Sequence, residues 1–459
     1  MNSEMKRKVD ALLDSWQEEY AAHLARWVRV PSVKGEAEDG APFGREVRRM
    51  LDMAMVDAET MGFMTHVYDG YACDITHGDE DAETIAVLGH LDVVPAGDGW
   101  QVPPFAAVRE GDRLYGRGTS DDKGPTLAAL YAMRAIKEAG VPLKRSIRMV
   151  LGCDEETDWE DMDYYCDHAQ MPEAGFSPDA SFPLINTEKG MIQMMIHAPF
   201  DGEGLKVLSL KSGERPNVIP GECTALVRGG EEVCARVRAF AEKTGMDYRA
   251  EVTGEGVKLT AVGIPGHSAY PLGRRNAIGM MLILLRELGA QGSLKTLADA
   301  YPLEQDGACL GIKCADDISG ALTCNIGILR LEEGTLSASI DCRCPVKADL
   351  NSLVESIRAH LPGFRLTDVS MTPPHHVPAD SELVTSLLAA YHEETGLPAV
   401  AESTGGGTYA KVLKQGVAFG ASFPDDEDLA HQAGEYVYLT KMILAAKIYA
   451  NALMKLCAE

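Results

Sequence analysis

A histidine and an aspartate stand one residue apart directly after an apolar run. Residues 84–88 lead through Gly89 to His90 and Asp92. A short apolar run of this kind predicts a buried strand, and the ligands of open α/β sheets bind beyond the carboxyl ends of the strands. An imidazole binds a metal in a fixed tautomer when an acceptor holds its second ring nitrogen, and a nearby carboxylate can do so. His90 is therefore either a metal ligand or an ordinary structural histidine, and the rest of the chain must decide between the two.

Further potential ligands also stand at expected strand ends or in loops: Asp121, Glu155, Glu156, Asp179 and His431. Each has an ordinary explanation when it is taken alone, such as a helix cap for Asp121. Together, two histidines and several carboxylates suit a pair of divalent cations. A carboxylate shared between two cations about 3.5–4 Å apart would hold them as a co-catalytic pair.

Several other catalytic patterns do not fit the sequence. The stretch 116–118, G-R-G, lacks the third glycine of a dinucleotide-binding fingerprint. His392 has no second histidine at the spacing that a zinc-protease helix requires, and the chain has no G-x-S-x-G elbow. The 11 cysteines show no C-x-x-C spacing, so we expect reduced thiols rather than disulfides or a zinc cluster.

Composition limits the classes of protein to consider. A chain of 459 residues predicts two or three domains. The formal net charge of -26 disfavours binding to nucleic acid and to anionic membrane surfaces. We find no secretory signal and no apolar stretch approaching the roughly 20 residues of a membrane span. The expectation is a cytoplasmic globular protein without a nucleic-acid or membrane partner.

The expected elements change in pattern along the chain. Helices and strands alternate up to residue 190 and again after residue 372, which predicts an α/β layer, whereas alternating strands dominate between them. The predicted helices lie at 5–30 (as one helix or two), 44–61, 125–139, 231–244, 276–288, 350–360, 381–395 and 438–457. The predicted strands lie at 72–76, 84–88, 146–152, 191–198, 206–211, 224–227, 257–262, 321–331, 335–343 and 417–423. The predicted architecture is an α/β domain with a largely parallel mixed sheet, built from residues 1–190 and 373–459, plus an inserted α+β domain of residues 191–372.

Six short strings, taken in order, resemble one enzyme family. They are G-H-L-D-V-V-P, G-R-G-T-S-D-D-K-G-P, D-E-E-T, P-D-A-x-F-P, G-G-G-T-Y-A and H-Q-A-G-E-Y. They resemble the co-catalytic dinuclear metallopeptidases that include carboxypeptidase G, aminoacylase and succinyl-diaminopimelate desuccinylase. Within that family, the chain is most similar to the bacterial PepV-type dipeptidases. The resemblance covers the chain from about residue 27 to its end.

This resemblance implies two divalent cations per chain, with Zn²⁺ the first expectation and Mn²⁺ the second. The implied ligands are Asp121 as the bridge, His90 and Asp179 at one site, and Glu156 and His431 at the other. Asp92 would orient His90, and Glu155 would be the general base and acid. The family also often has a cis peptide bond after the bridging aspartate, here between Asp121 and Asp122.

The inserted domain resembles the family's lid. Asn217, His267 and Arg343 match lid positions that hold the substrate, and His267 would also stabilise the oxyanion. Gly406 and Gly407 would offer backbone N–H groups to a carboxylate or an oxyanion. The acidic residues 425–428 carry more negative charge than we expect of PepV-like chains, which bears on substrate preference.

The implied reaction is hydrolysis of the peptide bond of unblocked dipeptides, with β-alanyl dipeptides as a further candidate. A lid as large as residues 191–372 resembles that of PepV-like proteins, where it takes the place of a dimer partner, so it implies a monomer that acts on short peptides. An alternative is an N-acyl-amino-acid deacylase or desuccinylase with the same metal core. A non-catalytic metal or peptide binder is disfavoured, because Glu155 and every implied ligand are present.

Overall fold

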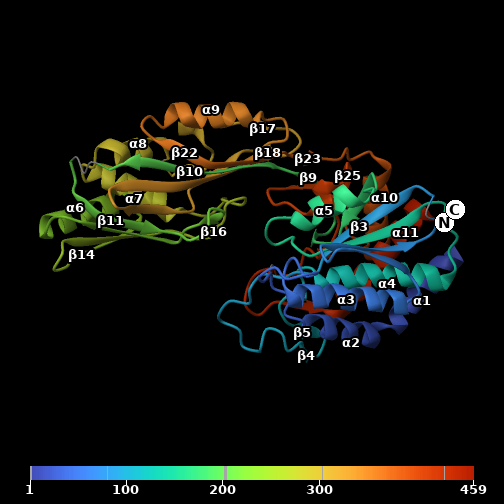
Figure 1. Ribbon diagram of the computed structural model, residues 1–459. Coiled ribbons are helices and arrows are strands. Elements are labelled where there is room, and N and C mark those ends of the chain that lie inside the picture. The colour runs from blue at the N-terminus through green and yellow to red at the C-terminus, as the bar shows by residue number, and fades with distance from the viewer. Residues whose placement is uncertain (1–2, 80, 201–203, 302, 428) are drawn as a thin grey trace. The chain divides into compact units, whose positions relative to one another are not determined.

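The chain forms two compact units, shown as a ribbon in Figure 1. The computed structural model describes residues 3–79, 81–200, 204–301, 303–427 and 429–459. Unit 1 comprises Met1–Asn186, His376–Glu402 and Gly407–Glu459, and unit 2 comprises Thr187–His375 and Ser403–Gly406. These boundaries lie a few residues from those expected at 190 and 372, and the short segment Ser403–Gly406 joins unit 2.

The sheet of unit 1 is parallel at its centre and antiparallel toward its edges. Its strand order is β1-β2-β6-β3-β7-β25-β9-β23, and β24 pairs with β9. The strands are β1 (Met64–Tyr68), β2 (Ala72–His77), β3 (Thr84–His90), β6 (Ser146–Gly152), β7 (Ala174–Ser177), β9 (Ile185–Glu188), β23 (His375–His376), β24 (Glu402–Thr404) and β25 (Gln415–Ala418). The boundaries between the units fall within β9, β23 and β24. The pairs β6–β3, β3–β7 and β7–β25 are parallel, whereas β1–β2, β2–β6 and β25–β9 are antiparallel. The predicted α/β class with a mixed sheet is confirmed.

Both faces of this sheet are buried because its central strands alternate apolar side chains between two cores. Ile85 and Val87 of β3 belong to the main hydrophobic core, whereas Ala86 and Leu88 join a smaller cluster with Tyr165. The helices of unit 1 are α1 (Ser3–Ser15), α2 (Gln17–Val28), α3 (Arg45–Thr60), α4 (Lys123–Ala139), α5 (Glu160–His168), α10 (Glu382–Thr395) and α11 (Leu439–Cys457), with the short 3-10 helix η2 (Tyr409–Val412). α4 and α11 pack in the main core, and α5 and η2 supply the smaller cluster.

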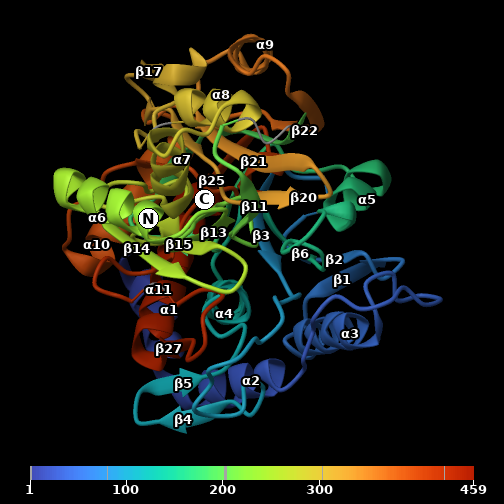
Figure 2. The same ribbon diagram turned by 90° about the vertical axis from the view of Figure 1, so that its left-hand side faces the viewer.

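A small three-stranded sheet of unit 1 links two distant parts of the chain. It contains β4 (Val108–Glu110), β5 (Arg113–Tyr115) and β27 (Tyr436–Tyr438), which lie together in Figure 2. β27 runs antiparallel to β5, with Tyr436 opposite Tyr115. A further parallel pair joins β8 (Ala180–Ser181) to β26 (Ala421–Ser422).

Unit 2 is built around an antiparallel sheet of order β14-β15-β13-β11-β20-β21-β10-β22, with β19 paired to β21. These strands are β10 (Gly190–Pro199), β11 (Val207–Ser212), β13 (Glu222–Val227), β14 (Asp247–Val252), β15 (Val257–Val262), β19 (Thr323–Asn325), β20 (Leu329–Glu332), β21 (Thr335–Cys344) and β22 (Arg365–Thr372). Two short ribbons are β12 (Val218–Ile219) with β16 (Gly266–His267), and β17 (Ala315–Asp316) with β18 (Gly320–Ala321). The helices are α6 (Glu231–Thr244), α7 (Ala277–Glu287), α8 (Gly292–Ala300), α9 (Leu350–His360) and the 3-10 helix η1 (Ala308–Leu310). This unit has its own hydrophobic core.

Some elements differ from the sequence prediction for local reasons. The expected strand 417–423 is divided into β25 and β26 by Gly420, whose φ of 81° is a conformation that glycine adopts readily. The expected strand 321–331 is divided into β18, β19 and β20. Helix α5 has no counterpart among the predicted helices, and it buries only Asp161, Met162 and Tyr165. Within the part of the chain that the structure describes, no helix is long and apolar enough to cross a membrane.

Candidate metal centre

The predicted ligands of unit 1 meet at one edge of its sheet. β3, β6 and β7 run parallel, so their carboxyl ends share that edge. His90 is the last residue of β3, Glu155 and Glu156 follow β6, and Asp179 follows β7. Asp121 reaches the same edge from the loop before α4, where its carboxylate lies 3.0 Å from His90. The sheet topology thus gathers residues from four separate segments.

The two carboxylate oxygens of Asp121 face two different histidines. Oδ1 lies 3.0 Å from Nε2 of His90, and the same nitrogen is 3.8 Å from Oδ2 of Asp179. Oδ2 of Asp121 lies 3.0 Å from Nε2 of His431, which is also 2.9 Å from Oε2 of Glu156. The side chain of His90 is fully buried, whereas that of His431 is 44% exposed. Asp121 therefore stands between two imidazole–carboxylate groups, one enclosed and one open to solvent.

Asp92 holds both His90 and the loop of the two glutamates. Nδ1 of His90 lies 3.1 Å from the backbone oxygen of Asp92 and 3.4 Å from its Oδ1. The carboxylate of Asp92 also accepts the backbone N–H groups of Glu155, at 3.2 Å, and Glu156, at 3.1 Å. A proton on Nδ1, donated to this acceptor, would leave Nε2 free to bind a metal.

The main chain beside Asp121 is packed closely against β3. The peptide bond between Asp121 and Asp122 is cis, as the resemblance implied. Oδ2 of Asp122 accepts the hydroxyl of Thr126 at 2.7 Å and the backbone N–H of His90 at 3.4 Å. A side chain at Gly89 would clash with the Thr126 hydroxyl. The absence of a Cβ at Gly89 lets the start of α4 approach the end of β3.

The electrostatics of this edge favour added positive charge. Burial raises the pKa of Glu155 well above its ordinary value, and the charges of Asp179, Glu156 and Asp121 raise it further. Burial, followed by the charge of Asp121, does the same to the pKa of Asp179. Hydrogen bonding to Asp121 and to Glu156 raises the pKa of His431 to about 10. Crowded carboxylates therefore stabilise a cation beside them, whether it is a proton or a metal ion.

The donor atoms fit divalent cations. Potential ligand atoms of His90, Asp121 and Glu156 lie within 4.8 Å of one another, and those of His90, Glu155 and Asp179 do so as well. Imidazole nitrogen and carboxylate oxygen are ligands that Zn²⁺ and Mn²⁺ both accept. The two groups have His90 in common. Asp121, which also faces His431, is the carboxylate that a pair of cations could share.

Comparison with known proteins agrees with this site. The model of peptidase family M20/M25/M40 matches residues 86–455. The chain belongs to this peptidase family. Its predicted membership in the co-catalytic metallopeptidases is confirmed, and the family's enzymes depend on metal ions. The chain is 37% identical to the Bacillus subtilis (strain 168) protein named "Putative dipeptidase YtjP", an alignment that covers 99% of this chain and 98% of that protein.

Two solved structures share the fold of this M20 family chain. The crystal structure of human carnosine dipeptidase 1 matches with a TM-score of 0.57 at 16% identity, and covers 98% of this chain and 99% of that one. The di-peptidase Dug1p from Saccharomyces cerevisiae matches with a TM-score of 0.59 at 13% identity, and covers 98% of each chain. At these identities the likeness concerns the fold alone.

The predicted lid residues lie in unit 2, where two of them are neighbours. β12 pairs with β16, so that Val218 lies opposite His267. The backbone oxygen of Asn217 accepts the N–H of Ser268 at 2.9 Å. His267 is exposed, whereas Arg343 is 4% exposed. The ribbon thus presents His267 at the surface of unit 2.

Two buried residues that the sequence analysis missed hold these lid residues in place. Both carboxylate oxygens of Asp341 lie 3.2 Å from the guanidinium of Arg343, and Oδ2 also accepts the hydroxyl of Ser268 at 2.5 Å. The side chain of Asn325 donates to the backbone oxygens on either side of Asn217, at 3.0 and 2.9 Å. Asp341 and Asn325 therefore fix the surroundings of Arg343, His267 and Asn217 within unit 2.

The glycine-rich turn is divided between the units. Gly406 belongs to unit 2 and Gly407 to unit 1. The backbone N–H of Gly406 donates to the hydroxyl of Thr404 at 3.0 Å, and the backbone oxygen of Gly405 accepts Nη1 of Arg343 at 2.7 Å. These contacts within unit 2 explain why Ser403–Gly406 groups with it.

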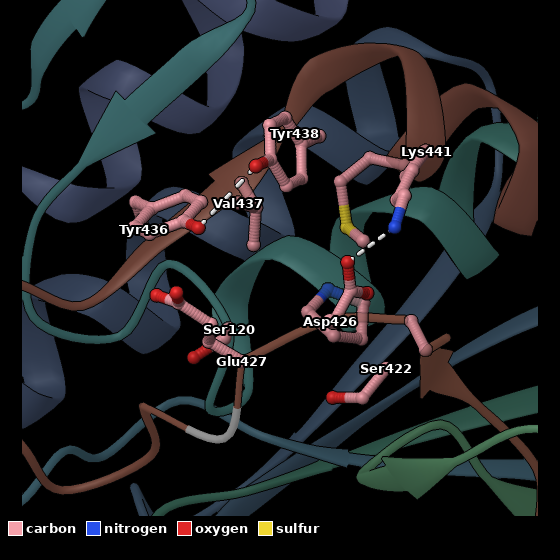
Figure 3. Close-up of a pocket in the computed structure, with 11 residues that line it drawn as sticks. Ser120, Ser422, Asp426, Glu427, Tyr436, Val437, Tyr438 and Lys441 are labelled. Atoms are coloured by element: carbon pink, nitrogen blue, oxygen red, sulfur yellow. Dashed lines mark hydrogen bonds and ion pairs between the residues drawn. The ribbon is translucent and has the colours of Figure 1, made fainter. Parts of the chain in front are cut away.

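The acidic stretch before His431 is partly neutralised. Lys441 forms ion pairs with Asp425 and Asp426, and the second of these is drawn in Figure 3. Asp428 lies outside the described residues. A cavity of about 30 Å³ beside this stretch is lined by residues that include Ser120, Tyr436 and Lys441 (Figure 3). That volume suits about one water molecule.

Proposed function

We propose that this chain is a dipeptidase that hydrolyses the peptide bond of unblocked dipeptides with the help of two divalent cations. The observation that carries the proposal is the position of Asp121, whose Oδ1 faces His90 and whose Oδ2 faces His431, each at 3.0 Å. Membership in a peptidase family and the dipeptidase name of a relative 37% identical over nearly the whole chain support it.

The proposed ligands follow from the positions of the two carboxylate oxygens of Asp121, one of which faces His90 and the other His431. His90 and Asp179 would complete one site, and Glu156 and His431 the other. We propose Zn²⁺ as the bound metal, with Mn²⁺ able to replace it, because both accept mixed imidazole and carboxylate ligands. A pair of such cations lowers the pKa of a water molecule and polarises a carbonyl group.

Glu155 is the proposed general base and acid. One carboxylate oxygen of Glu155 lies within 4.8 Å of a potential ligand atom of His90 and of one of Asp179, and its backbone N–H donates to the Asp92 carboxylate at 3.2 Å. Burial raises its pKa well above the ordinary value, so the carboxyl group holds a proton more firmly than an exposed glutamate does. Glu155 would take the proton of the attacking water and then deliver it to the leaving amine.

All but one of the proposed substrate contacts belong to unit 2, the exception being Gly407 of unit 1. We propose that His267 stabilises the oxyanion and that Asn217, Arg343 and the backbone of Gly406 and Gly407 hold the substrate. The exposed position of His267 and the fixed surroundings of Asn217 and Arg343 support these roles. We further propose that the enzyme is a monomer and that it acts in the cytoplasm. A mass measurement in solution tests the monomeric state.

A substrate panel tests the proposed function. Metal-free protein is reconstituted with Zn²⁺ or with Mn²⁺ and assayed on unblocked dipeptides, β-alanyl dipeptides, N-acetyl amino acids and N-succinyl amino acids. The proposal predicts the highest kcat/KM on a dipeptide. A higher value on an N-acetyl or N-succinyl amino acid would identify a deacylase or desuccinylase instead.

A further inference from the structure

Glu435 is a fully buried carboxylate that joins two of the sequence strings described above. Its side chain is 0% exposed. It ends the segment H-Q-A-G-E that begins with His431, and it contacts the segment R-G-T-S-D that ends with Asp121. Glu435 is neither one of the site residues predicted from the sequence nor one of the proposed cation ligands.

The contacts of Glu435 follow the loop of Asp121 residue by residue. Its Oε1 accepts the backbone N–H of Ser120 at 2.8 Å, the hydroxyl of Ser120 at 3.0 Å and the backbone N–H of Asp121 at 3.4 Å. Its Oε2 accepts the backbone N–H of Gly118 at 3.2 Å and Nη1 of Arg117 at 2.6 Å. The Glu435 carboxylate therefore accepts hydrogen bonds along the segment that carries Asp121, the proposed bridging ligand.

Strand pairing brings Glu435 to this loop. Tyr436 lies opposite Tyr115 where β27 pairs with β5, and the backbone oxygen of Glu435 accepts the N–H of Gly116 at 3.0 Å. Ser120 and Tyr436 line the same small cavity in Figure 3. The loop of His431 and the loop of Asp121 are thus joined through the main chain as well as through the Glu435 side chain.

The counter-charge of Glu435 is itself buried and held. Arg117 is 1% exposed, and its Nη2 donates to the backbone oxygen of Ala96 at 3.2 Å. A buried ion pair is weak evidence for stability, because desolvation of the two charges offsets their attraction. Groups that hold metal ligands in place, by contrast, commonly change metal affinity by about 10–100-fold when they are altered.

We propose that Glu435 is a positioning residue that fixes the loop of Asp121 to the loop of His431 and so sets the spacing of the two cation sites. This inference rests on the proposed function, since it concerns the same cations. Glu435 touches no reacting atom in this account and acts through Asp121 and His431.

Zinc titration of metal-free protein by calorimetry, with a competing chelator, tests the proposal. Glu435→Gln keeps the shape of the side chain but replaces one acceptor oxygen with an NH₂ group. We expect its zinc affinity to fall by about 10–100-fold. Arg117→Lys keeps the positive charge, but its single amino group replaces the two nitrogens that contact Glu435 and Ala96, so we expect a smaller loss of zinc affinity. This second variant serves if Glu435→Gln does not fold.

Asp57→Asn is the matched control. Asp57 is also a buried carboxylate of unit 1, and it accepts hydrogen bonds from His23, Arg26 and Trp27. We expect this variant to lower the melting temperature and keep the zinc affinity of the wild type. A Glu435→Gln protein that melts early but binds zinc like the wild type would overturn the positioning role. If Glu435→Gln does not fold, wild-type zinc affinity in Arg117→Lys would overturn it.

The failure of the proposed function has a different signature. A wild-type protein that binds fewer than two zinc ions, or binds two and cleaves no dipeptide, contradicts the proposed function whatever the variants do. A wild type that binds two zinc ions and cleaves dipeptides, beside a Glu435→Gln variant of equal zinc affinity, contradicts only the role of Glu435.

Discussion

Nε2 of His431 lies 2.9 Å from Oε2 of Glu156, although the two residues are 275 positions apart in the sequence. Unit 2 is inserted between them, so the candidate metal centre of unit 1 contains residues from both sides of the insertion. Asp121 lies 3.0 Å from the same nitrogen of His431. This contact makes the late histidine part of the site that the early carboxylates form.

Removal of His431 should empty one of the two cation sites. His431→Ala deletes the imidazole that faces Asp121 and Glu156, while His90 and Asp179 stay in place. Mutation of a residue that only supports a metal ligand typically lowers metal affinity or activity by about 10–100-fold. The loss of a ligand itself should therefore lower kcat/KM at least about 100-fold. Elemental analysis at a modest zinc excess should find one zinc ion per chain instead of two. Two tightly bound zinc ions in this variant would remove His431 from the ligand set.

Replacement of Glu155 should separate metal binding from turnover. Glu155→Gln keeps the shape of the side chain but removes its ability to accept and return a proton. General acid–base catalysis contributes about 10²–10⁴-fold, so kcat should fall by about that factor while two zinc ions remain bound. Full activity of the variant would refute the role of Glu155.

Asp341 should affect substrate binding through Arg343 and Ser268. Asp341→Asn replaces one acceptor oxygen and leaves the buried guanidinium short of a counter-charge. Hydrogen bonds to charged groups contribute about 1.5–3 kcal/mol, so KM for a dipeptide should rise by about 10–100-fold, with zinc content unchanged.

Asp316 provides a control for that variant in the same unit. Its carboxylate accepts backbone N–H groups of Ser319 and Lys347, at 2.6 and 2.9 Å, and neither of these is a proposed substrate residue. Asp316→Asn should leave KM near the wild-type value. Equal KM changes in the Asp341 and Asp316 variants would point to general destabilisation of unit 2.

Asp57 should give unit 1 a pH-dependent part of its stability. Burial acts to raise the pKa of Asp57, but hydrogen bonds from His23 and Trp27 and the charges of His23 and Arg26 lower it below its ordinary value of 3.8. A carboxyl group with a lowered pKa stabilises the folded state above the ordinary pKa, and this stabilisation is lost as the pH falls through the folded-state pKa.

Urea unfolding of metal-free protein measures this contribution. Asp57→Asn should lower the free energy of unfolding by about 2 kcal/mol near pH 7, since several hydrogen bonds to a charged group are altered. The difference between the variant and the wild type should shrink below about pH 4, where the wild-type carboxyl also becomes protonated. A difference that stays constant down to pH 2 would show that the charge of Asp57 has no part in it.

The sequence singled out the residues that meet at one edge of the sheet of unit 1 because their types and positions carry the signal, and their role as ligands stays a prediction. The apolar run before His90 predicts β3, and the expected strand 146–152 coincides with β6 (Ser146–Gly152). Hydrophobic runs mark strands whatever their partners, and ligands at the carboxyl ends of parallel strands share one edge. The family resemblance, carried over position by position, then implied which of these residues would share a cation.

The supporting residues could not be predicted in the same way. Glu435 reaches the loop of Asp121 because β27 pairs with β5. The two strands are far apart in the sequence, and neither has a local pattern that predicts their pairing. Asp341 and Asn325 lie on β21 and β19 among other polar residues, so their partners depend on the register of the sheet of unit 2. The helix α5 was missed because its acidic sequence buries few apolar side chains.

Anomalous diffraction at the zinc edge, from crystals of zinc-loaded wild-type protein, tests the two-cation site most directly. We predict two peaks on opposite sides of the Asp121 carboxylate, about 3.5–4 Å apart. One should lie about 2.0–2.2 Å from ligand atoms of His90 and Asp179, and the other at that distance from His431 and Glu156. A single peak, or zinc bound away from Asp121, would contradict the account.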